Sequence, residues 1–282
     1  MNTVKTIMEA RDQMKAWRKE GYTIALVPTM GYLHEGHASL IRRAASENEK
    51  VVVTIFVNPI QFGPKEDLAS YPKDLERDKL LCESAGAHLI FAPEVSEMYF
   101  EDALTNVSVN SLTDGLCGAK RPGHFDGVCT VVSKLFNIIP ADKAYFGEKD
   151  AQQLAVIKRM VRDLNFPIEI IGCPIVREDD GLAKSSRNNY LSLSERTAAL
   201  ILSKSLTKGK DILSSGEKST ELLKTIIKTQ LQSEVLASID YIEVVDALSL
   251  KPIEIIDKPT LVAIAVFIGK TRLIDNFIWK SE

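Results

Sequence analysis

The chain contains, at residues 23–37, the stretch Thr23-Ile24-Ala25-Leu26-Val27-Pro28-Thr29-Met30-Gly31-Tyr32-Leu33-His34-Glu35-Gly36-His37. Its first five residues are β-branched or apolar, as in a strand, and residues 38–45 have helical composition and apolar spacing. Two of the four histidines, His34 and His37, therefore lie at a strand-to-helix junction, where backbone N–H groups and the helix dipole favour anions. The pattern predicts a phosphate site with imidazole donors, in which Gly36 lets the backbone approach the ligand.

Two other interpretations of these histidines are open. One histidine could be structural, or both could bind a metal ion. A zinc site needs further His, Cys or carboxylate ligands, and no third histidine or cysteine lies nearby in the sequence. The phosphate site is therefore preferred.

Composition and charge narrow the class of protein. The 282 residues are 45% hydrophobic and 26% charged with a net charge of −3, which fits a globular protein and disfavours binding to nucleic acid. The four cysteines form no Cys-x-x-Cys pair and suit a reducing compartment. The N-terminus lacks a signal-peptide pattern, and no apolar run reaches the ~18 residues that span a bilayer. We expect a cytoplasmic protein that binds no membrane.

Predicted strands and helices alternate through the first part of the chain. The strands are expected at residues 23–27, 51–57, 88–91, 106–109, 144–146 and 168–176, and the helices at 39–47, 74–85, 128–138 and 151–164. Alternation of this kind predicts a mostly parallel α/β sheet, whose ligands bind beyond the carboxyl ends of the strands. The histidine motif falls at such an end.

The pattern changes after residue 176. A polar, turn-forming break at residues 177–181 precedes two predicted helices, 194–214 and 219–233. Three predicted strands follow, at residues 241–245, 261–268 and 272–278, the last two joined at Gly269-Lys270. We therefore expect a domain of residues 1–177 and a smaller α+β domain of residues 178–282.

Three further segments carry residues suited to a nucleotide and a small acid. Lys184, Ser185, Ser186 and Arg187 combine hydroxyls and cations in a loop, as would suit β- and γ-phosphates, although solvated loops often have this composition. Lys149 and Asp150 follow the strand at 144–146. Asp150 either caps the next helix or reaches a ribose hydroxyl, and Gln153, one turn along that helix, is placed to bind substrate.

The third segment, residues 56–64, places Asn58 and Gln61 among apolar residues, a pattern typical of a small ligand held by few hydrogen bonds. Arg121 is a further possible anion contact on a loop. The sequence contains no P-loop, dinucleotide fingerprint or Gly-x-Ser-x-Gly elbow, which excludes three common alternatives.

A strand, His-x-Gly-His, a helix and a later Lys-Ser-Ser-Arg loop resemble the two nucleotide motifs of the nucleotidylyltransferase and class I aminoacyl-tRNA synthetase superfamily. Five segments narrow the resemblance to the pantothenate synthetase (pantoate–β-alanine ligase) family. They are Pro28–His37, Phe56–Gly63, Arg121–Phe125, Gly147–Gln153 and Ser185–Asn188. Together they cover essentially the whole chain in order.

The resemblance implies ATP-dependent, Mg²⁺-assisted condensation of pantoate with β-alanine, which yields pantothenate, AMP and diphosphate through a pantoyl adenylate. It also implies a cytoplasmic homodimer with a Rossmann-like N-terminal domain and a smaller C-terminal lid domain.

The resemblance also implies roles for individual residues. His37 would be the general acid, with His34 and Lys149 as further catalytic residues. Pantoate would contact Gln61, Gln153 and Asn58, and β-alanine would contact Gln61. The ATP-binding residues would be Met30, Gly31, His34, Gly36, His37, Gly147, Lys149, Asp150, Val176, Lys184, Ser185, Ser186 and Arg187.

The chain departs from the family's sequence pattern at one position, and two alternative functions stay open. Lys184 stands where the family usually has Met. Its ammonium could tighten ATP binding, or it could project to solvent while its backbone contacts ATP, and we favour the second. The Mg²⁺ ligands are not assigned, and Asp78 and Asp150 are candidates. The rivals are an adenylyltransferase that leaves AMP on its product and a non-catalytic nucleotide-binding regulator.

Overall fold

The computed structural model describes residues 1–64 and 66–280, which form two compact units. The first unit comprises residues 1–110, 121–148 and 153–174. The second comprises residues 111–120, 149–152 and the chain from Ile175 onward. Two short segments that precede Ile175 in the sequence thus belong to the second unit. The domain boundary expected between residues 177 and 178 stays a prediction.

The first unit is built on a parallel sheet. Within the described residues the strands lie in the order β1-β4-β3-β2-β5-β6, and every pairing is parallel. Their bounds are β1 Asn2–Val4, β2 Ile24–Thr29, β3 Lys50–Ile55, β4 Leu89–Phe91, β5 Lys143–Gly147 and β6 Glu169–Cys173. The carboxyl ends of β2, β3 and β5 therefore meet at one edge of the sheet. The predicted Rossmann-like α/β class is confirmed.

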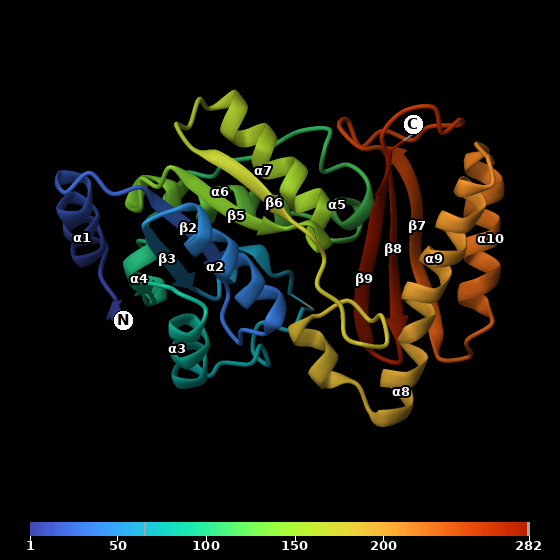
Figure 1. Ribbon diagram of the computed structural model, residues 1–282, viewed down its shortest axis with the longest axis horizontal. Coiled ribbons are helices and arrows are strands. Elements are labelled where there is room, and N and C mark those ends of the chain that lie inside the picture. The colour runs from blue at the N-terminus through green and yellow to red at the C-terminus, as the bar shows by residue number, and fades with distance from the viewer. Residues whose placement is uncertain (65, 281–282) are drawn as a thin grey trace. The chain divides into compact units, whose positions relative to one another are not determined.

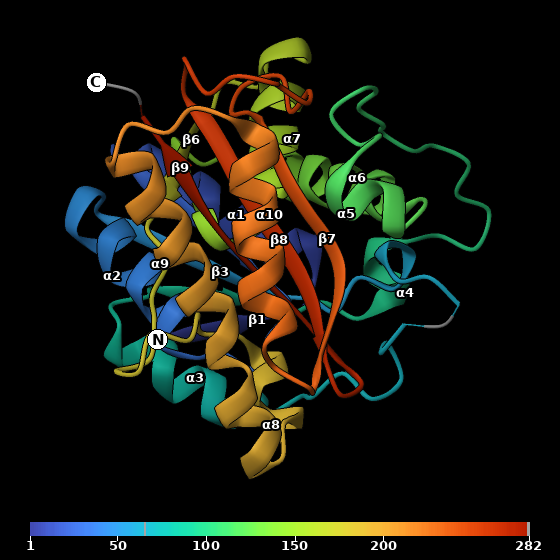
Figure 2. The same cartoon turned by 90° about the vertical axis from the view of Figure 1, so that its right-hand side faces the viewer.

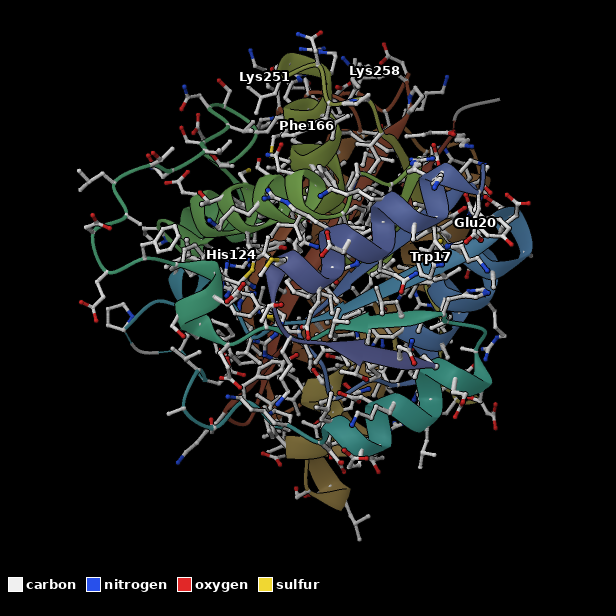
Figure 3. All side chains as sticks on the ribbon, turned by 90° about the vertical axis from the view of Figure 1, so that its left-hand side faces the viewer. Trp17, Glu20, His124, Phe166, Lys251 and Lys258 are labelled. Atoms are coloured by element: carbon white, nitrogen blue, oxygen red, sulfur yellow. The ribbon has the colours of Figure 1, made fainter. Side chains whose placement is uncertain are left out.

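Helices cover both faces of this sheet. They are α1 Ile7–Lys19, α2 Glu35–Glu47, α3 Leu75–Ser84, α4 Val95–Met98, α6 His124–Ile138 and α7 Ala151–Asp163, with the short turns η1 Pro59–Gln61 and η2 Glu148–Asp150. Helix α2 crosses β2, β3 and β5 (Figure 1). Helices α1 and α6 lie side by side on one face and α3 on the other (Figure 3). Fully buried strand residues such as Val27, Val53 and Ile90 form the core between the sheet, α2 and α3.

The second unit is an antiparallel sheet backed by two helices. The strands β7 Ala237–Asp246, β8 Thr260–Ile268 and β9 Thr271–Trp279 pair in that order, and β8 and β9 form the predicted hairpin. Helices α9 Leu200–Ser214 and α10 Thr220–Gln232 cover one face of this sheet (Figure 2). The remaining elements are α5 Leu116–Lys120, η3 Ser186–Tyr190 and α8 Leu193–Ala198. Leu206, Leu223 and Val262 belong to the core of this unit. The expected smaller α+β unit is confirmed as a fold.

Several expected elements differ from the structure. Strand β1 and helix α1 were not expected, because β1 has three residues and α1 buries only Ala10 and Met14. The strand expected at 106–109 is wrong, since those residues form no regular element. The helix expected at 194–214 is divided at Ala199 into α8 and α9.

The four cysteines are free and buried, and burial raises the pKa of the Cys82 and Cys129 thiols to about 12. Across the described part of the chain, no helix combines the length and apolarity that a membrane span requires.

Candidate active site

The turn between β2 and α2 adopts a conformation that depends on glycine. Gly31 has φ +87°, and a Cβ there would lie 2.9 Å from Ile55 Cγ2 and 3.1 Å from Asp78 Oδ2. Tyr32 also has positive φ, 50°. Such backbone is costly for residues with a Cβ, so Gly31 is required for the turn that leads into His34.

Asp78 holds this turn in place from helix α3. Its Oδ2 accepts the Tyr32 N–H at 2.8 Å and its Oδ1 accepts the Leu33 N–H at 2.7 Å. The side chain is 1% exposed, and burial raises the pKa of its carboxyl. Both carboxylate oxygens thus serve the backbone, so Asp78 does not fit the Mg²⁺ site for which it was a candidate.

His34 and His37 form a reciprocal cap at the start of α2. His34 Nδ1 accepts the Gly36 N–H at 3.1 Å, and His37 Nδ1 accepts the His34 N–H at 3.3 Å. Their ring centroids are 4.1 Å apart. Because each Nδ1 is an acceptor, the neutral rings carry their protons on Nε2. The cap therefore presents two imidazole N–H donors at a helix N-terminus, as an anion site requires.

The amide of Gln61 is oriented by Asn58. Asn58 is 1% exposed and its Nδ2 donates to the Gly127 carbonyl and to Gln61 Oε1, both at 3.0 Å. Tyr99 donates its hydroxyl to Asn58 Oδ1 at 2.8 Å, and burial raises the pKa of Tyr99. Gln61 Nε2 lies 3.2 Å from Met30 Sδ. Asn58 thus supports Gln61, while Gln61 and Met30, both predicted site residues, are in contact.

A second network holds the backbone of Gln61. His124, labelled at the start of α6 in Figure 3, lies with its Nδ1 2.9 Å from the Gln61 carbonyl and its Nε2 3.0 Å from Arg121. Arg121 donates to both oxygens of Glu66, at 2.6 and 2.7 Å. Burial alone would raise the pKa of Glu66, but Arg121 and the Gly63 N–H lower it below its usual value. Arg121 is therefore committed to Glu66, and its expected role as an anion contact is not supported.

Helix α6 packs closely against the turn η1 at Gly127. An added Cβ would lie 2.6 Å from Gln61 Cα and 2.7 Å from Ile60 O, which are backbone atoms. We expect Gly127→Ala to lower the free energy of unfolding by about 1–3 kcal/mol, despite the roughly 1 kcal/mol that alanine gains in helix propensity.

Gly209 supplies the matched control for urea-induced unfolding monitored by circular dichroism. In α9 the three atoms nearest to an added Cβ would be side-chain carbons of Ile227 and Leu223. Gly209→Ala should remain near the unfolding midpoint of the wild type. An unchanged or raised midpoint for Gly127→Ala would contradict the close approach.

Two predicted site residues of the first unit lie near the carboxyl end of β5. Gly147 is its last residue, and Gln153 is half-buried in the first turn of α7. The neighbouring Gln152 instead supports the 111–120 segment of the second unit, since its Nε2 donates to the Leu112 and Gly115 carbonyls at 2.9 Å.

Lys149 and Asp150 belong to the second unit. Lys149 Nζ lies 3.1 Å from Asp150 Oδ2, and the Lys149 carbonyl accepts a hydrogen bond from Asn276 Nδ2 at 2.8 Å. Asp150 is about half-exposed. In residues 1–64 and 66–280, no group of three His, Cys, Asp or Glu side chains is arranged to hold a metal ion. A role for Asp150 as a Mg²⁺ ligand stays a prediction.

The segment from Val176 to Lys184 is a short hairpin. The Lys184 N–H donates to the Val176 carbonyl at 2.9 Å, and Lys184 Nζ pairs with Glu178 at 2.8 Å. The Lys184 ammonium is therefore paired with Glu178 and does not simply project to solvent. Its effect on ATP binding and the contact of its backbone with ATP stay predictions.

The residues after this hairpin form a single helical turn beside β9. Ser185 caps η3 by accepting the Arg187 N–H at 3.3 Å, and Ser186 and Arg187 follow in that turn. The Asn188 amide donates to the Ala183 carbonyl at 3.1 Å and ties the turn to the hairpin. Ser185, Ser186 and Arg187 are thus presented together by a short, capped turn.

Comparison with known proteins places these features in a family. The model of the family described as pantoate-beta-alanine ligase matches residues 2–278. The chain belongs to the pantoate–β-alanine ligase family. It is 64% identical over 278 residues to a protein of Enterococcus faecalis named pantothenate synthetase, and 63% identical over 279 residues to one of Clostridium acetobutylicum. In both comparisons 99% of each chain is covered.

Solved structures agree with this family. A crystal structure of the Thermus thermophilus pantoate–β-alanine ligase matches with a TM-score of 0.94 and 46% identity, covering 98% of this chain and 99% of that one. The Francisella tularensis ligase, described as a complex with β,γ-ATP and β-alanine, matches with a TM-score of 0.79 and 34% identity, covering 99% and 97%.

Several supporting residues of this ligase were not found from the sequence. They are Asp78 as a clamp on the turn, and Glu66, Tyr99, His124, Asp275 and Asn276. Most of their bonds join residues 41 to 127 positions apart, so no local spacing reveals them. The signal was residue type alone: polar side chains in otherwise apolar stretches, such as Asp275-Asn276 in β9.

Proposed function

We propose that this chain condenses pantoate with β-alanine at the expense of ATP and forms a pantoyl adenylate on the way. The observation that carries the proposal is the full-length identity of 64% to a protein named pantothenate synthetase. The paired imidazoles at the start of α2 and the oriented Gln61 amide support it. AMP and diphosphate are the other products.

In the first step a carboxylate oxygen of pantoate attacks the α-phosphorus, and the bond from that phosphorus to the oxygen of the leaving diphosphate breaks. Negative charge grows on the α-phosphate oxygens and on the leaving group. We propose that the Nε2–H groups of His34 and His37 donate hydrogen bonds to the oxygens on which this charge grows. The role of His37 as a general acid requires its protonated form and stays a prediction. Donors fixed before the reaction stabilise such charge without reorganisation.

The second unit supplies the remaining cations and hydroxyls. We propose that the phosphates of ATP are bound by Lys149, Ser185, Ser186 and Arg187. The rest of the nucleotide would contact the backbone at Val176 and Lys184. Gly147 and Asp150 are further proposed ATP contacts, as are Met30, Gly31 and Gly36 in the first unit. Closure of the second unit as a lid over the adenylate stays a prediction.

We propose that the side-chain amides of Gln61 and Gln153 bind pantoate. Asn58 acts on pantoate through Gln61, because its Nδ2 protons are donated to Gly127 and Gln61. In the second step the amine of β-alanine, held near Gln61, attacks the acyl carbon. The bond from that carbon to the AMP oxygen breaks, and the nitrogen loses a proton.

Mg²⁺ fits as an ion that enters with ATP. Mg²⁺ usually binds through substrate phosphates, waters and one or two carboxylates rather than a protein cage. Asp150 is the carboxylate we assign to it, since its side chain is about half-exposed. When bound, the ion neutralises polyphosphate charge.

We also propose a cytoplasmic homodimer. Free cysteines suit a reducing compartment, and all four in this chain are free. For the dimer, the first unit exposes apolar side chains, Phe100 at 74% and Leu104 at 97%. Light scattering of the purified chain tests the dimer, and a monomer mass would contradict it.

The experiment for the function measures diphosphate and AMP with ATP, pantoate and β-alanine, each omitted in turn. We expect bound adenylate and one equivalent of diphosphate without β-alanine, and free AMP on its addition. AMP retained on the final product would instead indicate an adenylyltransferase. ATP binding without diphosphate release would indicate a regulator.

A further inference from the structure

Two consecutive residues of β9 hold two separate segments of the second unit. Asp275, 2% exposed, accepts two hydrogen bonds from Arg177, at 2.7 and 2.9 Å. Asn276, 5% exposed, donates from Nδ2 to the Lys149 carbonyl at 2.8 Å. The Arg177 segment leads to the Ser185–Arg187 turn, and Lys149 is the cation we assign to phosphate.

The backbone of Lys149 needs such support. It lies in η2, a single 3₁₀ turn of three residues, and short 3₁₀ turns have poorer hydrogen-bond geometry than an α-helix. The Asn276 bond spans 127 positions and ends on a strand paired along its whole length with β8. Strand β9 is therefore more rigid than η2, and the hydrogen bond from Asn276 holds the turn in place relative to the strand.

Asn276 is itself fixed by the ion pair beside it. Its backbone N–H donates to Asp275 Oδ1 at 2.8 Å. The same oxygen accepts from Arg177 Nη2, whose guanidinium also donates to the Gly181 carbonyl at 3.0 Å. One carboxylate thus connects the 177–181 loop to the peptide of the residue that holds Lys149.

We propose that Asn276 is a positioning residue, which acts through the Lys149 carbonyl to place the Lys149 ammonium for adenylate formation. The inference rests on the proposed function in one respect, the assignment of Lys149 to the phosphates. A misplacement of about 1 Å in a catalytic group costs on the order of 10²-fold in rate. Loss of the Asn276 amide should therefore reduce turnover and leave pantoate binding intact.

The test is a double-mutant cycle on the full chain, with single-turnover adenylate formation from radiolabelled ATP as the readout. Asn276→Leu removes the donor and keeps a similar size. We expect its rate to fall roughly 10–100-fold with an unchanged KM for pantoate. In a Lys149→Met background, Asn276→Leu should change the rate by less than about twofold, because Asn276 acts on the rate by positioning Lys149.

Two further variants keep the result interpretable. Asn276→Asp, which keeps the shape, repeats the cycle if Asn276→Leu does not fold. Asn137→Leu is the matched control, since Asn137 Nδ2 also donates to a carbonyl, that of Ser133 at 2.9 Å, and it should keep the wild-type rate.

A fall of equal size in both backgrounds, or no fall in the wild-type background, would overturn the proposal for Asn276. Failure of the proposed function is a different result, in which the wild-type chain itself forms no adenylate.

Discussion

Replacing His37 with alanine is expected to slow pantoyl-adenylate formation by about 10²–10⁴-fold. The variant loses a donor at the start of α2 that the structure orients before substrate arrives, because His37 Nδ1 is bonded to the His34 N–H. ATP binding should weaken far less, since the charge that His37 meets grows in the transition state. Rapid-quench measurement of the adenylate in a single turnover separates the two effects.

Two milder variants separate the cap from the chemistry. Asn at position 37 can still accept the His34 N–H near the place of Nδ1, but it cannot reach as far as Nε2. Gln carries an N–H near the place of Nε2. We expect His37→Asn to retain stability and remain slow, and His37→Gln to recover part of the rate. Wild-type adenylate formation in His37→Ala or His37→Asn would contradict the assignment.

Removing the Arg177 side chain is expected to destabilise the second unit by about 3 kcal/mol. Arg177→Met leaves the Asp275 carboxylate buried without its bidentate partner, which costs several kcal/mol when a buried ion pair is broken from one side. The expected loss of about 3 kcal/mol is at the low end of the range for a broken buried ion pair, because the Arg177 side chain is partly exposed.

Tryptophan fluorescence can report on this unit alone. The chain has two tryptophans, Trp17 in α1 and Trp279 at the end of β9. In a Trp17→Phe background, urea-induced unfolding followed through Trp279 should show the loss for Arg177→Met. The double variant Arg177→Met/Asp275→Asn should recover at least half of it, because the unpaired charge is gone. A double variant as unstable as the single one would show that charge burial is not the cause.

The sheet and the histidine turn were predictable because their signals are local. A buried strand, a glycine turn and an amphipathic helix follow one another within about 25 residues, and each leaves a periodic pattern. Helix α1 gave a weaker signal, since its buried face consists of Ala10 and Met14 alone. Residues 106–109 alternate like a strand, yet they form none, because alternation does not specify a pairing partner.

The supporting network of the site was not predictable in the same way. Asn58 reads from sequence as a ligand residue, because a polar amide among apolar residues needs a partner. The structure supplies that partner from Gly127 and Tyr99, far along the chain. Lys184 shows the same limit, since its pairing with Glu178 depends on the hairpin that brings them together. The sequence shows which polar side chains need hydrogen-bond or ion-pair partners, but the fold determines which residues those partners are.

The central claim is that a pantoate carboxylate oxygen attacks the α-phosphorus of ATP. Pantoate labelled with ¹⁸O in its carboxylate tests this directly, with the products analysed by mass spectrometry after complete turnover. The account predicts one ¹⁸O atom in AMP and none in diphosphate, because the acyl carbon–oxygen bond breaks in the second step. Unlabelled AMP, or label in inorganic phosphate released with ADP, would contradict it.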